Sequence, residues 1–224
     1  MGLESSKESE GPVVQVVSAR NGNRFETYYI NLEHRKDRKR EIENELSSIG
    51  VPNFQRFNAI KHKKGAMGCS ASHIECLKLA IASGADHILV FEDDFEFLIS
   101  PEEFQQLLQS IQEVKYDVVL LGYFFHSKND IKNTTHPLLK KIEKSQTTSG
   151  YIVHRDYLPT LLNNYMQGLA LLRAFHNKTN KFAIDIFWKR LQIVDNWYTF
   201  KKRPGKQRQS YSDIEGMVTN YKGI

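Results

Sequence analysis

Long apolar runs, cysteines and prolines are all scarce in this chain of 224 residues, which has 2 cysteines and 6 prolines. No apolar run approaches the roughly 20 residues of a membrane-spanning helix, which argues against an integral membrane protein. Cys69 and Cys76 are too few for a disulfide scaffold and lack the spacing of a zinc knuckle, so a reducing compartment is the default expectation. The start of the chain also lacks the apolar core of a signal peptide, which favours a cytoplasmic protein.

The remaining composition is that of an ordinary globular protein. Hydrophobic residues make up 40% of the chain and charged residues 25%, and this length suffices to bury a substantial core. We expect a flexible segment over residues 1–24, which offers little to bury, and a single domain over residues 25–224. The start "MGLESS" also fits M-G-x-x-x-S through Gly2 and Ser6, which indicates either N-myristoylation or a chance match to a short pattern.

Positive charge is in excess, with a formal net charge of +5. It gathers in three clusters that could meet nucleic acid, an anionic membrane surface or the phosphates of a small substrate, or could be solvated faces. Few aromatic residues interleave with them, which weakens the case for nucleic acid. The clusters are "HRKDRKR" (34–40), "KHKK" (61–64) and "FKKRPGKQR" (200–208).

Strand and helix patterns alternate along the chain. This alternation predicts an α/β fold with a mostly parallel sheet and helices on both faces. The polar, lysine-rich stretch 124–148 shows neither period, so we expect a long loop there. Predicted strands cover 25–32, 54–60, 87–94, 116–123, 149–155 and 196–200, and predicted helices cover 33–50, 65–84, 101–114, 157–167 and 183–192.

The stretch "ILVFEDDFEFL" (88–98) runs from a buried strand directly into three carboxylates. Crowded or buried anions are unfavourable unless something neutralises them. A divalent cation such as Mg²⁺ or Mn²⁺, held by Glu92 and Asp94, would do so and would leave coordination positions for substrate phosphates. The alternative is a solvated acidic turn, although apolar residues on both sides disfavour it.

Basic residues follow the first predicted strand. Arg35 and Arg38 lie near the start of a helix, where they could hold a phosphate or the edge of a base. The alternative is an exposed helix with charge pairs such as Asp37–Arg40. His73 lies beside an apolar helix face, so it is either a structural residue or a hydrogen-bonding partner for a nucleotide.

Two further polar groups allow more than one interpretation. Ser70 and Ser72 lie close to His73, but no G-x-S-x-G elbow surrounds them, so Ser/His hydrolysis is disfavoured. Asp185, in "FAIDIFWKR", is a single acid among apolar residues. It is either a helix N-cap or a general base whose pKa is raised by its surroundings.

Taken together, these segments resemble glycosyltransferase family 25, which includes lipooligosaccharide galactosyltransferases and collagen hydroxylysine galactosyltransferase domains. The likeness extends over about residues 25 to 216, and the matching segments occur in the family's order. They are "YYINLEHRKDRK", "GAMGCSASH", "ILVFEDD", "DVVLLG", "SGYIVHRDYLPTLL", "AIDIFW" and "KQRQSYSDIE".

The resemblance implies a GT-A-type fold and inverting transfer of a sugar, galactose or glucose, from a UDP-sugar with the help of Mn²⁺ or Mg²⁺. Asp94 and Glu92 would hold the metal, and Asp185 would be the catalytic base. Lys206 or Arg208 could add positive charge for the departing diphosphate. The residues expected to bind the donor nucleotide are Asn31, Arg35, Arg38, His73, Glu92, Asp93, Gln207, Ser210 and Asp213.

The acceptor would be a hydroxyl of a glycan or a protein. Because the chain lacks a secretory signal, we expect a bacterial or virus-encoded enzyme in the cytoplasm, with peripheral membrane contact as an open alternative. Two other functions stay in view: a catalytically silent relative that serves as a binding or virion protein, and a basic nucleic-acid-binding module.

Overall fold

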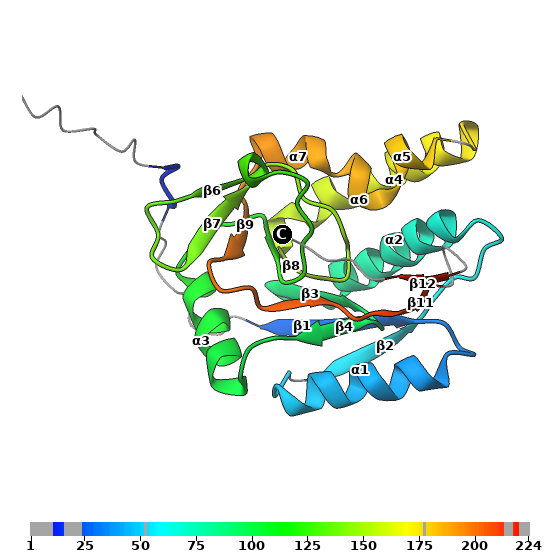
Figure 1. The fold of residues 1–224 in the computed structure, drawn as a ribbon, viewed down its shortest axis with the longest axis horizontal. Helices are drawn as coiled ribbons and strands as arrows, with labels where there is room; N and C mark the ends of the chain where they lie inside the picture. Colours follow the sequence, from blue (N-terminus) through cyan, green and yellow to red (C-terminus); the bar gives the residue numbers. More distant parts are fainter. Residues whose placement is uncertain (1–10, 16–23, 52, 177, 213–216, 220–224) are drawn as a thin grey trace, which may run out of the picture.

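An eight-stranded sheet forms the centre of the computed structural model (Figure 1). The structure describes residues 11–15, 24–51, 53–176, 178–212 and 217–219, with side chains up to residue 209. Along the sheet the strands are β2 (Phe54–Asn58), β1 (Phe25–Asn31), β3 (His87–Glu92), β8 (Gly150–His154), β5 (Val118–Leu120), β9 (Trp197–Phe200), β7 (Leu139–Ile142) and β6 (Ile131–Asn133).

The direction of the strands confirms the predicted fold class. β1 is parallel to both β2 and β3, and β5 is parallel to β9, whereas β8 and β7 run antiparallel to their neighbours. The sheet is therefore mixed, with most strands in one direction. β8 lies between β3 and β5, so the carboxyl end of β3 is next to the start of β8.

Helices cover both faces of this sheet, with α2, α4, α5, α6 and α7 on one face and α1 and α3 on the other (Figure 1). Side chains alternate along a strand, and β3 shows the result: Ile88 and Val90 join the α2 side of the core, while Leu89 and Phe91 join the α1 side. The helices are α1 (Lys36–Ser48), α2 (Gly65–Ser83), α3 (Pro101–Gln112), α4 (Leu158–Ala174), α5 (Thr179–Phe182), α6 (Ile184–Phe187) and α7 (Lys189–Val194).

Local sequence signals explain where the helices begin and end. Ser100 and Glu103 form a capping box at the start of α3, as predicted, and Pro101 occupies the first helical position. At the end of α2, Gly84 has a φ of 66°, a left-handed conformation that favours glycine. In α1, Ile42 and Leu46 are fully buried one turn apart and hold the helix against the sheet.

The prediction of a long loop over 124–148 was wrong, because β6 and β7 lie within it and extend the main sheet. Leu139 and Ile142 of β7 are fully buried, but lysines stand between them and hide the apolar pattern. The Lys141 ammonium donates to the carbonyls of Gln192 and Asp195 at the end of α7. These hydrogen bonds satisfy the Lys141 ammonium, so a lysine can occupy this strand of the sheet.

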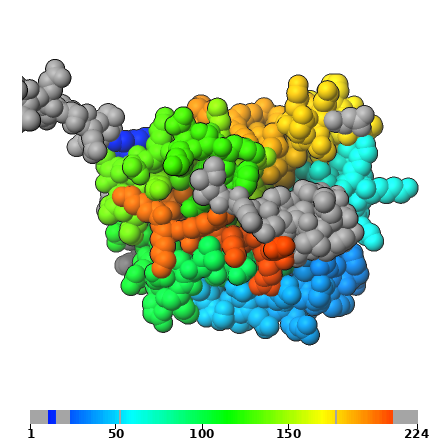
Figure 2. Space-filling view, in the orientation of Figure 1, coloured from blue at the N-terminus to red at the C-terminus, as the bar shows by residue number. Residues whose placement is uncertain are grey.

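Short strands near the site complete the described chain. β4 (Phe95–Phe97) follows Glu92, Asp93 and Asp94, which we call the acidic turn, and pairs antiparallel with β10 (Gly205–Gln207). β11 (Ser210–Ser212) pairs with β12 (Met217–Thr219). Residues 201–209 cross the face of the molecule seen in Figure 2. They run between helices α1 and α3 on one side and helix α2 on the other.

Part of the segment 1–24 is also described. Val14 is buried, its N–H donates to the Thr135 hydroxyl at 3.4 Å, and the Lys115 N–H donates to the Gln15 carbonyl at 2.8 Å. The division into a flexible segment and one domain stays a prediction, and Gly2 and Ser6 lie outside the described residues. Among the described helices, none combines the length and the apolar character that crossing a bilayer requires.

Candidate functional site

The acidic turn at the end of β3 sends its carboxylates to opposite faces of the sheet. Asp93 is buried and turns toward α1, where it accepts hydrogen bonds from Arg38 Nη1 at 2.8 Å and from Asn31 Nδ2 at 2.7 Å. Asn31, the last residue of β1, is itself held by Arg56 Nε, which donates to its Oδ1 at 3.0 Å. Parallel pairing of β1 and β3 brings these groups together, because both strands end at the same edge of the sheet.

Asp94 carries the least compensated charge of the three. Its Oδ2 lies 3.4 Å from Arg38 Nη1 and accepts a hydrogen bond from Gln207 Nε2 at 3.0 Å. Its Oδ1 is buried and has no hydrogen-bond partner among the described residues. Burial and the nearby carboxylates of Glu92 and Asp93 raise the pKa of Asp94 from 3.8 to about 7.

Glu92 faces the other way, toward α2. Its Oε1 lies 3.3 Å from His73 Nε2 and accepts a hydrogen bond from the Thr148 hydroxyl. The opposite ring nitrogen of the fully buried His73 is 3.0 Å from the Tyr151 hydroxyl on β8. The His73 ring is therefore fixed by two partners, with one nitrogen presented to the acidic turn.

Cys69 completes a cluster that was not predicted from the sequence. Ligand atoms of Cys69, His73 and Glu92 all lie within 4.8 Å of one another. Cys69 and His73 are four residues apart on α2, so their side chains share one face of the helix. That spacing of four residues is visible in the sequence and is the signal that indicates the cluster.

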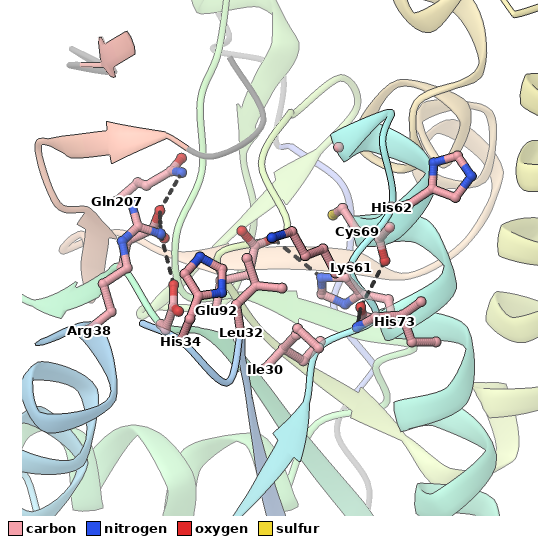
Figure 3. A pocket seen from close by; sticks show the side chains of 17 residues that line it. Ile30, Leu32, His34, Arg38, Lys61, His62, Cys69, His73, Glu92 and Gln207 are labelled. Carbon is pink, nitrogen blue, oxygen red and sulfur yellow. Dashed lines mark hydrogen bonds and ion pairs between the residues drawn. The ribbon is translucent and has the colours of Figure 1, made fainter. Parts of the chain in front are cut away.

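Two cavities adjoin at this cluster, and both are lined by Gly65, Cys69, Glu92 and Gln207. The first lies between the carboxyl end of β1 and the start of α2 (Figure 3). The second has a volume of about 720 Å³, within the usual range of a small-molecule site. The first is also lined by Leu32, His34, Arg38, Ala59, Ile60, Lys61, His62, His73, Asp93 and Asp94, and the second by Lys63, Lys64, Tyr123, Phe124, His126, Thr147, Thr148, Asp185 and Arg203.

Asp185 lies on the wall of the second cavity, in the first turn of α6. The N-cap of that helix is Ala183, so the alternative of an N-cap role for Asp185 was wrong. Its Oδ2 instead accepts the Thr147 backbone N–H at 3.2 Å, from the segment before β8. Burial, followed by the charge of Glu92, raises the pKa of Asp185 despite this hydrogen bond.

Gln207 is a predicted residue that the structure brings to both cavities. It reaches the acidic turn from β10, and its Oε1 also accepts a hydrogen bond from the Thr147 hydroxyl at 3.3 Å. The tail that carries it is fixed by Arg208, whose guanidinium lies 2.9 Å from a carboxylate oxygen of both Glu41 and Glu45 on α1.

Other predicted residues lie apart from the cavities or beyond description. The Arg35 guanidinium pairs with Asp37 at 2.8 Å on the first turn of α1 and lines neither cavity. The Lys206 ammonium lies 3.7 Å from Glu96. The side chain of Ser210 and all of Asp213 lie outside the described part of the chain.

The serines beside His73 show no nucleophile arrangement. The Ser70 hydroxyl donates to the Ala66 carbonyl at 2.8 Å, and the Ser72 hydroxyl donates to the Gly68 carbonyl at 2.7 Å. Both are bonds within α2, and the ring nitrogens of His73 lie against Tyr151 and Glu92 instead. This geometry agrees with the expectation that Ser/His hydrolysis is disfavoured.

A hard divalent cation fits the acidic turn on the chemistry of its donors. The unpartnered Oδ1 of Asp94 supplies a free oxygen, and Glu92 lines both adjoining cavities. Carboxylate oxygens suit Mg²⁺ and Mn²⁺, which also accept water and phosphate oxygens. The raised pKa of Asp94 has the same origin, since the turn holds more negative charge than Arg38 offsets.

Among the solved structures that share this fold are two that cover most of the chain. A197 from STIV has 10% sequence identity and a TM-score of 0.51, and the match covers 90% of this chain and 96% of A197. A glycosyltransferase involved in the glycosylation of the major capsid of PBCV-1 has 11% identity and a TM-score of 0.54, covering 85% of this chain and 95% of that chain. At such identities the likeness concerns the fold alone. No curated protein matches the sequence.

Residues 63–175, half of the chain, match the sequence profile of glycosyltransferase family 25 (LPS biosynthesis protein). The chain therefore belongs to glycosyltransferase family 25, as its motifs predicted, and it is a glycosyltransferase. The matched span contains the acidic turn together with Cys69 and His73, whereas Asp185 and Gln207 lie beyond it.

Proposed function

We propose that the protein transfers a hexose, galactose or glucose, from a UDP-sugar to an acceptor hydroxyl, with inversion at the anomeric carbon and with Mn²⁺ or Mg²⁺. The observation that carries the proposal is the pair of adjoining cavities that meet at Glu92, one beside the acidic turn and the other beside Asp185. Such an arrangement suits a reaction in which a donor and an acceptor must meet at one carbon atom.

The first cavity suits the nucleotide. Leu32, Ala59 and Ile60 give it apolar surface for a base, while Arg38 and Asp93 offer hydrogen-bonding groups at its wall. Asn31 lies behind Asp93 and orients its carboxylate rather than lining the cavity. The cation, when bound by Asp94 and Glu92, would neutralise charge on the departing diphosphate.

Basic residues of one segment line both cavities. Lys61 and His62 line the first cavity, and Lys63 and Lys64 line the second. Because this segment, "KHKK", lines both cavities, its lysines would assist the release of the diphosphate in this proposal. The basic cluster that the sequence showed at 61–64 therefore has a role in this proposal beyond solubility.

The second cavity suits the acceptor, and Asp185 is the base that we assign to it. An inverting transfer needs one group to take the proton of the acceptor hydroxyl as its oxygen attacks the sugar carbon. Burial raises the pKa of the Asp185 carboxyl toward the range in which general bases work best. The segment 124–148 supplies Phe124, His126 and Thr147 to the same wall.

Ligand-induced stabilisation tests this proposal directly. UDP with Mn²⁺ should raise the melting temperature of the protein, and Asp94→Ala should remove that rise. Each member of a panel of nucleotide sugars is then assayed for transfer or for slow hydrolysis of the donor. An equal ligand-induced rise in melting temperature in both proteins, or stabilisation without turnover of any sugar, would contradict the proposal, and the second outcome would favour a silent relative.

A further inference from the structure

Cys69, His73 and Glu92 form a set of donors unlike the oxygen-only acidic turn beside them. The set offers one sulfur, one imidazole nitrogen and one carboxylate oxygen, all within 4.8 Å of one another. Thiolate and imidazole ligands favour Zn²⁺ and similar ions over Mg²⁺ and Mn²⁺. The chemistry of this cluster therefore selects a different ion from the one assigned to Asp94.

The ring of His73 is already oriented as a metal ligand. Metal-binding histidines usually direct their second ring nitrogen at a fixed partner, which sets the tautomer and the ring plane. In this structure, His73 Nδ1 lies 3.0 Å from the Tyr151 hydroxyl, and Nε2 points at Glu92 Oε1 at 3.3 Å. Tyr151 is fully buried on β8, so the imidazole is supported by a rigid part of the core.

The spacing of the donors is close to that of a tetrahedral zinc site. Ligand atoms in such a site lie roughly 3.4 Å apart, given bond lengths of about 2.0–2.3 Å. His73 and Glu92 already meet this distance, and a small adjustment of Cys69 would complete the set. Cys69 and Glu92 line both cavities, so an ion has an entry path and a fourth position open to solvent.

We propose that Cys69, His73 and Glu92 form a site for Zn²⁺ or another thiophilic divalent ion, with three protein ligands and one exchangeable position. Binding converts the Cys69 thiol to a thiolate and releases its proton to solvent. Glu92 is also a ligand in the proposed hard-cation site, so the two ions compete for this carboxylate. That competition rests on the proposed function, whereas the zinc site itself does not.

Cobalt is a direct probe of the site, because a thiolate bound to Co²⁺ gives a charge-transfer absorption band. Co²⁺ is added to the full chain without nucleotide, and the band is followed in the native protein, in Cys69→Ser and in Cys76→Ala. Cys76 is a matched control, since it lies on the same helix but is buried away from the cavities. We expect one Co²⁺ per chain, displacement by Zn²⁺, and loss of the band in Cys69→Ser alone.

Tyr151→Phe provides a second variant that leaves all three ligands in place. Loss of the hydroxyl that fixes His73 should weaken Zn²⁺ binding by about 10–100-fold. A band that is absent from the native protein, that persists in Cys69→Ser or that disappears with Cys76→Ala would overturn the site. If the cobalt band behaves as expected but Zn²⁺ leaves stabilisation by UDP and Mn²⁺ unchanged, the site stands and the competition is wrong.

Discussion

Replacing Asp94 by asparagine should stabilise the empty protein while removing its response to metal. Asparagine has nearly the same shape as aspartate but carries no charge. The pKa of Asp94 rises from 3.8 to about 7 through burial and through repulsion from Glu92 and Asp93. Keeping this carboxylate ionised in the fold therefore weakens the protein in mildly alkaline, metal-free buffer.

The size of the effect follows from that shift. At about 1.4 kcal/mol per pKa unit, the full shift corresponds to about 4 kcal/mol. This net shift already includes the favourable charge of Arg38, but asparagine would bury an amide N–H₂ beside Arg38 or at the position of the unpartnered Oδ1. Such an unsatisfied donor offsets part of the gain by about 1–3 kcal/mol. We expect a net stabilisation of about 1–2 kcal/mol, or a rise in melting temperature of about 2–8 °C for a chain of this size.

Differential scanning calorimetry with EDTA, and then with Mn²⁺ and UDP, measures both effects in one experiment. The ligands should raise the melting temperature of the native protein and leave that of Asp94→Asn nearly unchanged. Glu75→Gln is the control, because it removes one carboxylate from the exposed face of α2, where Glu75 pairs with Lys78. If Asp94→Asn melts at or below the native temperature in EDTA and still responds to the ligands, the electrostatic reasoning is refuted.

Three further predictions concern the base, the core and acid stability. Asp185→Asn should lower turnover by about 10²–10⁴-fold while stabilisation by UDP and Mn²⁺ is kept; unchanged kcat would exclude Asp185 as the base. Gly150→Ala should destabilise the fold by about 1–3 kcal/mol in urea, because an added Cβ would lie 2.5 Å from the Phe95 ring; an unchanged midpoint would contradict this. Burial, followed by the charge of His154, lowers the pKa of His87 from 6.5 to about 4, so stability that is complete above pH 6.5 should fall toward pH 4 by roughly 1.4 kcal/mol per unit. His87→Gln should flatten this slope in melts across that range, and equal slopes would show that other groups cause the acid sensitivity.

Much of the fold followed from local signals in the sequence. The capping box at Ser100 and the apolar face of α1 were visible because each depends on residues a few positions apart. β6 and β7 were missed because their burial depends on partners far along the chain, and the lysines of β7 concealed its buried positions. Strand patterns also do not reveal direction, so the antiparallel insertion of β8 between β3 and β5 could be learned only from the structure.

Residues of the candidate site were predictable where both the residue type and its place at the end of a strand or the start of a helix pointed to the site. The carboxylates at 92–94 were identified because a buried strand runs directly into them, and Arg38 because it lies near the start of the helix that follows the first strand. The structure brings Arg38 and Asn31 together at Asp93. Arg35 was placed with them from helix periodicity, but it lies at the N-cap and pairs with Asp37. Cys69 could have been found from its spacing to His73, whereas the contact of Gln207 with Asp94 spans 113 residues and leaves no local trace.

The large sequence separation between Asp94 and Gln207 has a consequence for folding during synthesis on the ribosome. The strand that ends in the carboxylates is synthesised well before β10, which provides Gln207 and the Arg208 anchor to α1. A nascent chain can therefore assemble most of its sheet while both cavities still lack Gln207. A chain that ended after β9 would contain all eight strands of the main sheet but would lack Gln207 and the Arg208 anchor. On the proposed function, nucleotide-sugar binding would therefore require synthesis to continue beyond that point.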